Sequence, residues 1–447
     1  MTEAIEKIKE AFKGYQLWYV GGAVRDEIMG VPSHDIDLAT NATPRDIIET
    51  CEMFDLNFRY TENSIAHGTI TVEGIEITTF RKDISCDGRN ATTEWAKTIE
   101  EDLSRRDITI NAISKNVYSG EIVDPFFGIQ DIKNKIIRAV GNPEERLKED
   151  TLRALRAIRF SNKFNFTIEK ELFFAIYETN IFNLSVERVR EEFMKILETL
   201  NDRYIDIIIL KVIPEFEILY GLDGGNKHAE SVYQHSIMTM ENSMKISNNP
   251  LNSFIAILHD IGKGYTFNDP EKMFKGHEDI GAEKIKEIME RMKFSNEDIY
   301  YAYTMVKNHM RWHFFDDGKE PSDRSIRRAI RDLPDNFNKE IMIKDLMILT
   351  WADNQANLLN KPESFEDYTI RRGIYTRALE ILKTKPIIKS GSGLNINGTD
   401  LIEMGFKPSP LFNTILKDIE NQVFEEKLEN EKEILKKFVM ENYARNT

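Results

Sequence analysis

Two aspartates and a pair of glycines near the amino terminus have the types and spacing that nucleotide chemistry requires. The β-forming run Leu17–Val20 leads to Gly21 and Gly22, after which a helix is expected to begin. Glycines let the backbone approach a ligand closely, and free N–H groups at a helix start attract phosphate. Asp35 and Asp37 follow on the next expected strand, where a period of two places both carboxylates on one face. Such carboxylates repel each other unless a cation lies between them, and hard oxygen ligands suit Mg²⁺ that carries nucleotide phosphates.

A second group of charged residues has the chemistry to recognise a base. If Glu149, Asp150 and Arg153 lie on a helix, Asp150 and Arg153 share one face, because positions i and i+3 are neighbours. A carboxylate accepts from an exocyclic amine and a guanidinium donates to ring acceptors, so the pair can imitate the edge of a template base and favour cytosine or adenine. An ordinary i,i+3 ion pair is the alternative. Arg156 and Arg159 add positive charge beside this segment, which suits an RNA end.

Six of the eight histidines fall between positions 228 and 313. With two aspartates, four of them form an ordered pattern, H…HD…H…H…D, made by His235, His259, Asp260, His277, His309 and Asp353. Imidazole and carboxylate without thiolate suit a divalent transition-metal ion that activates water. His228 and His313 fall outside the pattern and are expected at the surface.

Composition limits the classes of protein that remain. The 447 residues suggest about three domains. No apolar stretch approaches the roughly 20 residues of a membrane helix, so we expect no membrane partner. Cys51 and Cys86 are the only cysteines, which excludes a disulfide scaffold and favours a reducing cytoplasm. The net charge of −15 argues against a surface that binds nucleic acid all over, although phosphate contacts depend on local basic clusters.

The elements that must position these residues change in type along the chain. From about residue 5 to 137, short β-rich runs such as Thr69–Val72 and 75–80 alternate with helical stretches such as Val24–Met29 and 44–54, which predicts a mixed α/β domain. From about Asn142 onward, apolar residues recur at helical spacing and strand signals nearly vanish.

About the first 200 residues resemble the class II tRNA nucleotidyltransferases, a family that includes the CCA-adding enzymes and the bacterial poly(A) polymerases. After the Gly21–Asp37 segment, further motifs follow in family order: Asp87-Gly88-Arg89 for ribose recognition, Arg105-Arg106-Asp107 through Asn111 for head closure, Asp124-Pro125-Phe126 with Gly128 for the turn after it, Glu149-Asp150-x-x-Arg153 for nucleotide templating, and Ser185-x-Glu187-Arg188 through Glu192 as a structural motif. Two departures are Ile108, where Phe is usual, and Asn90-Ala91, where Arg-Pro is common.

The resemblance implies nucleotidyl transfer, in which a polynucleotide 3′-hydroxyl attacks the α-phosphorus of a nucleoside triphosphate. It implies Mg²⁺ at Asp35 and Asp37, with Glu76 either a third catalytic carboxylate or an exposed strand residue. It also implies that Glu149 orients Arg153. The implied nucleotide contacts are Gly21, Gly22, Arg25, Asp87, Arg89, Arg106, Asp107, Asn111, Glu149, Asp150, Arg153, Arg156 and Arg159, and the implied partners are the tRNA 3′ end, CTP and ATP.

The histidine pattern, together with the sequence 258–263 (LHDIGK), resembles the HD phosphohydrolase superfamily, which implies phosphatase or cyclic phosphodiesterase activity. We therefore expect an α+β chain, with a small polymerase-β-like head on a mixed sheet followed by an all-α neck, body and tail. The expected domains are the nucleotidyltransferase head (1–140), the neck with the template motif (141–222), the HD metal-binding domain (223–360) and a tRNA-binding tail (361–447).

Several functions are consistent with these patterns. The leading hypothesis is addition of C, C and A to tRNA. An A-adding tRNA enzyme and a poly(A) polymerase are alternatives of the same class. An HD metallohydrolase whose head only binds RNA is an alternative of a different class. A non-catalytic RNA chaperone fits poorly with two apparently complete metal constellations.

Overall fold

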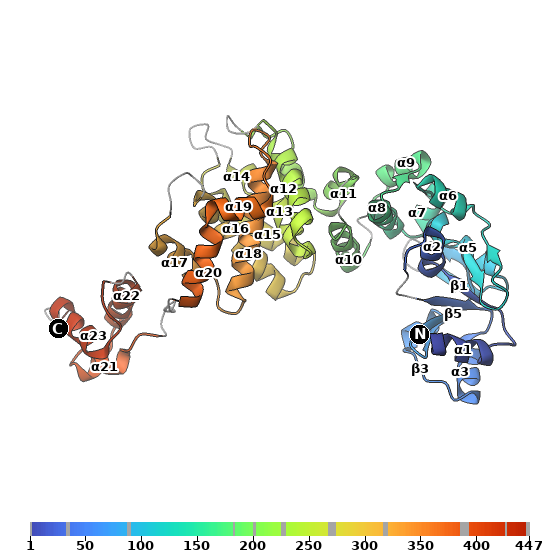
Figure 1. The fold of residues 1–447 in the computed structure, drawn as a ribbon, viewed down its shortest axis with the longest axis horizontal. Coiled ribbons are helices and arrows are strands. Elements are labelled where there is room, and N and C mark those ends of the chain that lie inside the picture. Colours follow the sequence, from blue (N-terminus) through green and yellow to red (C-terminus); the bar gives the residue numbers. More distant parts are fainter. Residues whose placement is uncertain are drawn as a thin grey trace. The chain divides into compact units, whose positions relative to one another are not determined.

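The computed structural model describes residues 2–32, 36–86, 91–181, 184–199, 203–224, 229–266, 274–315, 321–384, 393–424 and 427–443. Six residues discussed above, Asp35, Asp87, Gly88, Arg89, Asn90 and His228, lie outside this part of the chain. The chain divides into two compact units, one of residues 1–217 with 291–293 and the other of residues 218–290 with 294–447. Figure 1 shows the elements of both units.

The first unit is built on a seven-stranded mixed sheet. In sheet order its strands are β3 (Phe58–Arg59), β4 (Thr69–Val72), β5 (Ile75–Thr79), β2 (Asp37–Thr40), β1 (Leu17–Val20), β8 (Ser114–Asn116) and β9 (Ile122–Val123). Strand β2 runs antiparallel to β1 and parallel to β5. Buried and exposed residues alternate along β5, as expected for a strand with one face toward the core. The mixed sheet of the expected head is therefore present.

Each face of this sheet carries its own apolar cluster. Helices α1 (Thr2–Ala11) and α3 (Pro44–Met53) pack on one face, where Phe12 and Ile47 are fully buried with sheet residues. Helix α5 (Ile99–Ser104) packs on the other face, where Leu103 is buried with Phe80. Figure 1 accordingly shows α1 and α3 on the side of β1 opposite to α2 (Gly22–Met29) and α5. Both layers together fix the sheet that carries Asp37.

The remaining elements of the first unit are short strand pairs and helices. The strand pairs are β6 (Arg81–Cys86) with β7 (Ala91–Trp95), antiparallel, and β10 (Ile136–Ile137) with β11 (Thr167–Ile168), parallel. The helices are α4 (Glu62–Ala66), η1 (Thr109–Asn111), α6 (Gly128–Asn134), α7 (Pro143–Glu149), α8 (Leu152–Phe164), α9 (Lys170–Glu178), α10 (Val186–Leu197) and α11 (Ile205–Val212), and η2 (Pro214–Leu219) follows. Helix α8 packs against α10, with Ile158 and Phe193 fully buried.

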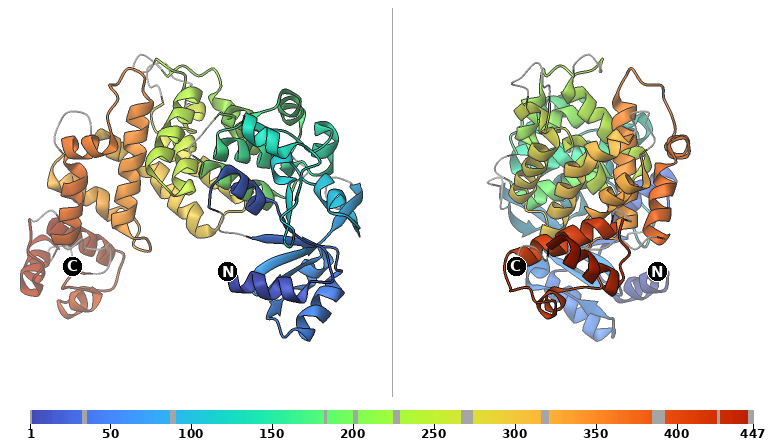
Figure 2. Two further views of the ribbon diagram at one scale, coloured as in Figure 1. Left: turned by 45° about the vertical axis from the view of Figure 1, so that its right-hand side comes forward. Right: turned by 90° about the vertical axis from the view of Figure 1, so that its left-hand side faces the viewer.

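The second unit is all helical in the described residues. Its helices are α12 (Val232–Ile246), α13 (Pro250–Leu258), α14 (Lys263–Thr266), α15 (His277–Arg291), α16 (Asn296–Phe314), α17 (Asp323–Arg331), α18 (Lys339–Ala356), α19 (Phe365–Arg372) and α20 (Ile374–Thr384). Helix α12 packs against α13 and α18, and α16 packs against both of these helices, which Figure 2 shows as green to orange ribbons. This bundle contains the histidines of the H…HD…H…H…D pattern.

Three further helices near the carboxyl terminus share a core of their own. They are α21 (Gly398–Glu403), α22 (Leu411–Phe424) and α23 (Lys432–Tyr443). Leu401, Ile415, Ile419 and Leu435 are fully buried in this core. Among the described helices, none has both the length and the apolar character of a membrane span.

Candidate functional site

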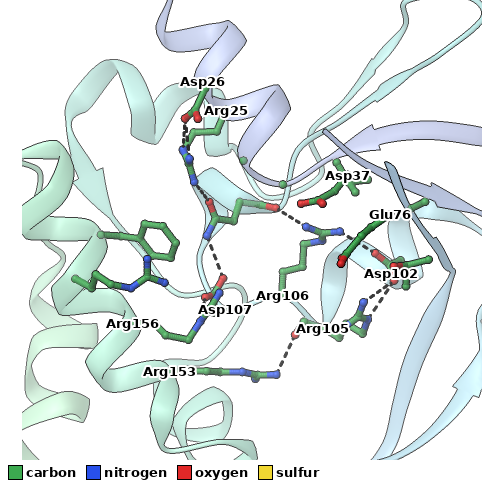
Figure 3. A pocket seen from close by; sticks show the side chains of 18 of the residues that line it. Arg25, Asp26, Asp37, Glu76, Asp102, Arg105, Arg106, Asp107, Arg153 and Arg156 are labelled. Carbon is green, nitrogen blue, oxygen red and sulfur yellow. Dashed lines mark hydrogen bonds and ion pairs between the residues drawn. The ribbon is translucent and has the colours of Figure 1, made fainter. Parts of the chain in front are cut away.

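A cavity of about 960 Å³ opens in the first unit beside the edge where β1 and β2 meet α2. Asp37 and Glu76 line it from neighbouring strands, and they are Cα partners in the parallel pairing of β2 with β5. Figure 3 shows both side chains at the same end of the cavity. Because the predicted partner Asp35 lies outside the described residues, the expected Asp35–Asp37 geometry stays a prediction. The sheet register instead brings Glu76 next to Asp37.

Gly21 lines the cavity at the start of α2, as the sequence predicts for a phosphate-binding turn. Its φ of 66° is a conformation that residues with a side chain rarely adopt, and a Cβ there would lie 3.0 Å from Arg106 Nη1. Gly22 is the first residue of α2 and also lines the cavity. The backbone can therefore approach a ligand at this turn.

A network of hydrogen bonds fixes the polar side chains behind this turn (Figure 3). Arg25 is 4% exposed, and its guanidinium donates to Asp26 at 2.7 and 2.8 Å and to Asn111 Oδ1 at 2.6 Å. Asn111 Nδ2 donates in turn to Asp107 at 3.4 Å, and Arg156 Nε donates to the same carboxylate at 2.8 Å. Four residues expected to contact nucleotide thus form one connected chain at the cavity wall.

Two buried carboxylates in this network keep their negative charge. Burial would raise the pKa of Asp107, but the Arg156 guanidinium and the N–H of Ile108 outweigh burial and hold that pKa below its ordinary value. Burial likewise opposes ionisation of Asp102, whereas Arg105 and Arg106 lower its pKa. Each acid fixes the direction of an arginine that lines the cavity.

The segment 149–153, which the sequence predicts to recognise a base and which we call the base-recognition segment, contradicts one expectation. Asp150 and Arg153 do not lie on one continuous helix, because α7 ends at Glu149 and Asp150 is extended, with φ −151° and ψ 103°, before α8 begins at Leu152. Asp150 Oδ1 accepts from the N–H of Leu152, and such local capping competes with helix continuation. Both side chains still line the same cavity.

The expected contact between Glu149 and Arg153 is present. Glu149 Oε2 accepts from Arg153 Nη1 at 2.5 Å and from Arg146 Nη1 at 2.8 Å. Arg153 also donates to the backbone carbonyls of Arg146 and Arg105. Arg159 lines the cavity and donates to Glu192 at 2.8 Å.

The second unit brings the six residues of the histidine pattern together. His235, His259 and Asp353 form one group of potential metal ligands and Asp260, His277 and His309 form another, with the ligand atoms of each group within 4.8 Å of one another. Asp260 Oδ1 lies 3.1 Å from His277 Nε2, and Asp260 Oδ2 lies 3.3 Å from His259 Nε2. Asp260 therefore borders both groups.

Every imidazole of the pattern is anchored through Nδ1. Three of them contact backbone carbonyls: His259 contacts Ala256 at 2.7 Å, His277 contacts Phe274 at 2.8 Å and His309 contacts Val306 at 2.6 Å. His235 Nδ1 contacts the Glu230 carboxylate at 3.1 Å. An Nδ1–H donor leaves Nε2 as the metal-binding atom, so the arrangement fits a divalent metal.

Sequence reasoning missed two residues of this centre. Glu230 lies in a loop before α12, where no helical spacing connects it with His235. His313 was expected at the surface outside the pattern, yet its Nδ1 lies 3.3 Å from Asp353 Oδ2 and its side chain is only 30% exposed. His313 is four residues after His309 on α16, so the i,i+4 spacing was the available signal.

Close backbone packing and electrostatics complete the centre. A Cβ on Gly262 would lie 2.0 Å from the carbonyl oxygen of His277, the first residue of α15. Only glycine at position 262 therefore allows the start of α15 to pack this closely against it. Burial and the neighbouring His277 and His259 lower the pKa of His309 to about 3. Burial opposes protonation of His259, but Asp260 and Asp353 raise its pKa to about 10.

Comparison with known proteins agrees with this geometry. A poly(A) polymerase head domain matches residues 17–138, an HD domain matches 232–358, and a putative tRNA nucleotidyltransferase domain 2 matches 370–439. The CCA-adding enzyme of Ligilactobacillus salivarius is 30% identical over 445 residues, which cover 96% of this chain and 93% of the relative. The CCA-adding enzyme of Leuconostoc mesenteroides is 29% identical over 450 residues, with 98% and 94% covered.

Solved structures share the fold. The Bacillus stearothermophilus CCA-adding enzyme in complex with CTP has a TM-score of 0.62 at 24% identity, with 99% of this chain and 96% of that chain covered. The Thermotoga maritima CCA-adding enzyme complexed with tRNA-CCA has a TM-score of 0.57 at 20% identity, with 98% and 93% covered.

The fold and the family matches together define a nucleotidyltransferase with a poly(A) polymerase-type head and an HD domain. Membership of this class implies a divalent metal ion at the transferase site. The chain belongs to the CCA-adding enzyme family, as its full-length similarity to the Ligilactobacillus salivarius enzyme shows. The predicted family and the α+β fold class are thereby confirmed.

Proposed function

We propose that this protein adds C, C and A to the 3′ end of tRNA from CTP and ATP, without a nucleic-acid template. The observation that carries this proposal is that one cavity contains both the carboxylates Asp37 and Glu76 and the base-recognition residues Asp150 and Arg153. A phosphate held at the sheet edge and a base held at α8 can thus belong to one nucleotide. The family relationship to CCA-adding enzymes supports the same reaction.

The residues of the cavity have separable tasks in this reaction. Asp37, with Asp35, would hold Mg²⁺, and Glu76 would be the third carboxylate, since carboxylate oxygens are ligands that Mg²⁺ prefers. Bound Mg²⁺ lowers the pKa of the attacking 3′-hydroxyl and neutralises charge on the attacking and leaving oxygens. The turn at Gly21 and Gly22 would receive the triphosphate at the start of α2.

Base selection would fall to Asp150 and Arg153, which accept from the amino group and donate to the ring acceptors of cytosine or adenine. The fixed network of Arg25, Asn111 and Asp107 would position the cavity wall. Arg106, Arg156 and Arg159 would supply positive charge to the nucleotide, and Asp87 and Arg89 would contact ribose. We further infer the divisions 1–140 for the head, 141–222 for the neck, 223–360 for the HD domain and 361–447 for a tRNA-binding tail.

Extension of a labelled tRNA that ends at the discriminator base tests this function. CTP alone should add two nucleotides, CTP with ATP should add three, and ATP alone should add none. Long A tails would indicate a poly(A) polymerase, and a single A added only to tRNA already ending in CC would indicate an A-adding enzyme. Either result would contradict the proposal.

A second activity is favoured by the six converging ligands of the HD centre. We propose that these residues hold a divalent transition-metal ion and that the centre hydrolyses phosphoesters. Asp37→Ala should abolish nucleotide addition and spare phosphoester hydrolysis, whereas His259→Ala should do the reverse. If the wild-type protein hydrolyses phosphoesters but never extends tRNA, the head is an RNA-binding module and the alternative of an HD metallohydrolase is correct.

A further inference from the structure

Arg188 reaches the cavity from α10, in a motif to which the sequence assigned only a structural role. Its Nη2 donates to Asp150 Oδ2 at 2.8 Å, and Arg188 itself lines the cavity. The other carboxylate oxygen, Asp150 Oδ1, accepts from the backbone N–H of Leu152 at 3.1 Å. Both oxygens of Asp150 are therefore fixed, one by the adjacent backbone and one by a guanidinium 38 residues away.

The start of α10 explains why Arg188 lies there. Ser185 caps the helix by accepting from the N–H of Arg188 at 3.4 Å, which places Arg188 in the first turn. One turn later, Glu192 accepts from Arg159 of α8 at 2.8 Å. Two ion pairs thus connect α10 to Asp150 and α8. Asp150 depends on this external contact because its extended backbone removes it from both α7 and α8.

The other arginines along this part of the cavity hold different acids. Arg153 donates to Glu149, Arg156 donates to Asp107 and Arg159 donates to Glu192. None of these three contacts leads to Asp150. Loss of Arg188 would accordingly leave the Asp150 carboxylate restrained by one bond, from the N–H of Leu152 to Oδ1, in place of two, while the neighbouring pairs stay in place.

We propose that Arg188 is a positioning residue that determines which bases the enzyme accepts, an inference that rests on the proposed function. By fixing the Asp150 carboxylate, Arg188 keeps an acceptor directed at the base edge. The amino group of cytosine or adenine satisfies that acceptor, whereas the carbonyl oxygen of uracil or guanine opposes it with a second acceptor. Discrimination therefore depends on a repulsive contact that only a fixed carboxylate maintains.

Because Arg188 is partly exposed, its proposed role in base selection can be tested without disturbing the fold. Its side chain is 43% exposed and that of Asp150 is 30% exposed, and ion pairs of such exposure contribute little to stability. Removing the guanidinium should thus leave the fold intact. The effect should appear in the choice of nucleotide.

The test compares kcat/KM for CTP and for UTP on tRNA that ends at the discriminator base, in the full-length protein. Arg188→Ala should lower the CTP-to-UTP ratio about fivefold, which corresponds to the upper end of the contribution of an exposed ion pair. Arg188→Lys, which keeps a donor, should give an intermediate ratio. Arg45→Ala removes an exposed arginine from a carboxylate pair on α3, outside the cavity lining, and should leave the ratio unchanged.

A double-mutant cycle completes the test. In an Asp150→Ala background, adding Arg188→Ala should not change the ratio further, because the acceptor that Arg188 holds is already absent. An unchanged ratio in Arg188→Ala, or an equal loss of rate with both nucleotides, would overturn the inference. A wild-type protein that adds no C would refute the proposed function itself, and this result appears before any variant is measured.

Discussion

Replacing Glu149 with Gln tests whether the Arg153 guanidinium, which we propose recognises the base, must be oriented by a carboxylate. The substitution keeps the shape of the side chain and removes the negative charge of the carboxylate that accepts from Arg146 and Arg153. A hydrogen bond between charged groups contributes about 1.5–3 kcal/mol. Arg153 keeps its two bonds to backbone carbonyls, and Glu149 is 28% exposed, so the lower end applies. A loss of about 1.5 kcal/mol corresponds to roughly a tenfold change in affinity.

We therefore expect Glu149→Gln to raise KM for both CTP and ATP about tenfold, with a smaller change in kcat, because the proposed role of Arg153 is to bind the base. Steady-state extension of tRNA lacking three or one terminal nucleotides measures the two constants separately. Glu144→Gln is the matched control, since Glu144 is 75% exposed on the same helix and lies 4.0 Å from Lys148. Unchanged KM for both nucleotides, or the same rise in the control, would refute the reasoning.

Three further predictions concern other parts of the molecule. Asp37→Asn should reduce nucleotide addition below detection in a tRNA extension gel, while Co²⁺ binding in the second unit persists. Glu230→Gln should weaken Co²⁺ binding about 10–100-fold by titration calorimetry, because it removes the carboxylate behind the His235 ring; equal affinity would exclude this role. Asp107→Asn should lower the free energy of local opening around residues 105–115, measured by hydrogen exchange, by about 1–3 kcal/mol at pH 7. Since the folded pKa of Asp107 lies below its ordinary 3.8, the ionised carboxylate stabilises the fold above that value, and this advantage over Asn should disappear as the pH falls through the lower folded pKa. A difference independent of pH would contradict this attribution.

Local sequence patterns predicted the elements well where one face of a strand or helix is buried. The runs Leu17–Val20 and Thr69–Val72 are strands, and the expected helix at 44–54 is α3, which Thr43 and Asp46 begin with a capping box. These features follow from period, propensity and capping within a few residues. The adjacency of Asp37 and Glu76 cannot be predicted from such local patterns, because strand pairing across 39 residues depends on the whole sheet.

The base-recognition segment shows where helical spacing misleads. Asp150 and Arg153 have the spacing of one helical face, yet an extended residue separates α7 from α8. Two of the contacts that orient the pair come from Arg188 and from the carbonyl of Arg105, both more than thirty residues away. Both residues of the family motif line the cavity, whereas periodicity gave the wrong backbone.

The arginine–acid pairs of the cavity reconcile a chain of net charge −15 with phosphate chemistry. Pairing each guanidinium with a carboxylate lowers the net attraction for phosphate but fixes the direction of each donor, which is what discrimination between bases requires. Two hydrogen bonds of these arginines also connect elements: Arg153 donates to the backbone carbonyl of Arg105, and Arg156 donates to the Asp107 carboxylate. Arg153 on α8, which we propose recognises the base, is therefore positioned by the same segment, 105–107, that brings Arg106 beside the proposed phosphate turn at Gly21. Any change that shifts this segment should alter base selection and catalytic rate together.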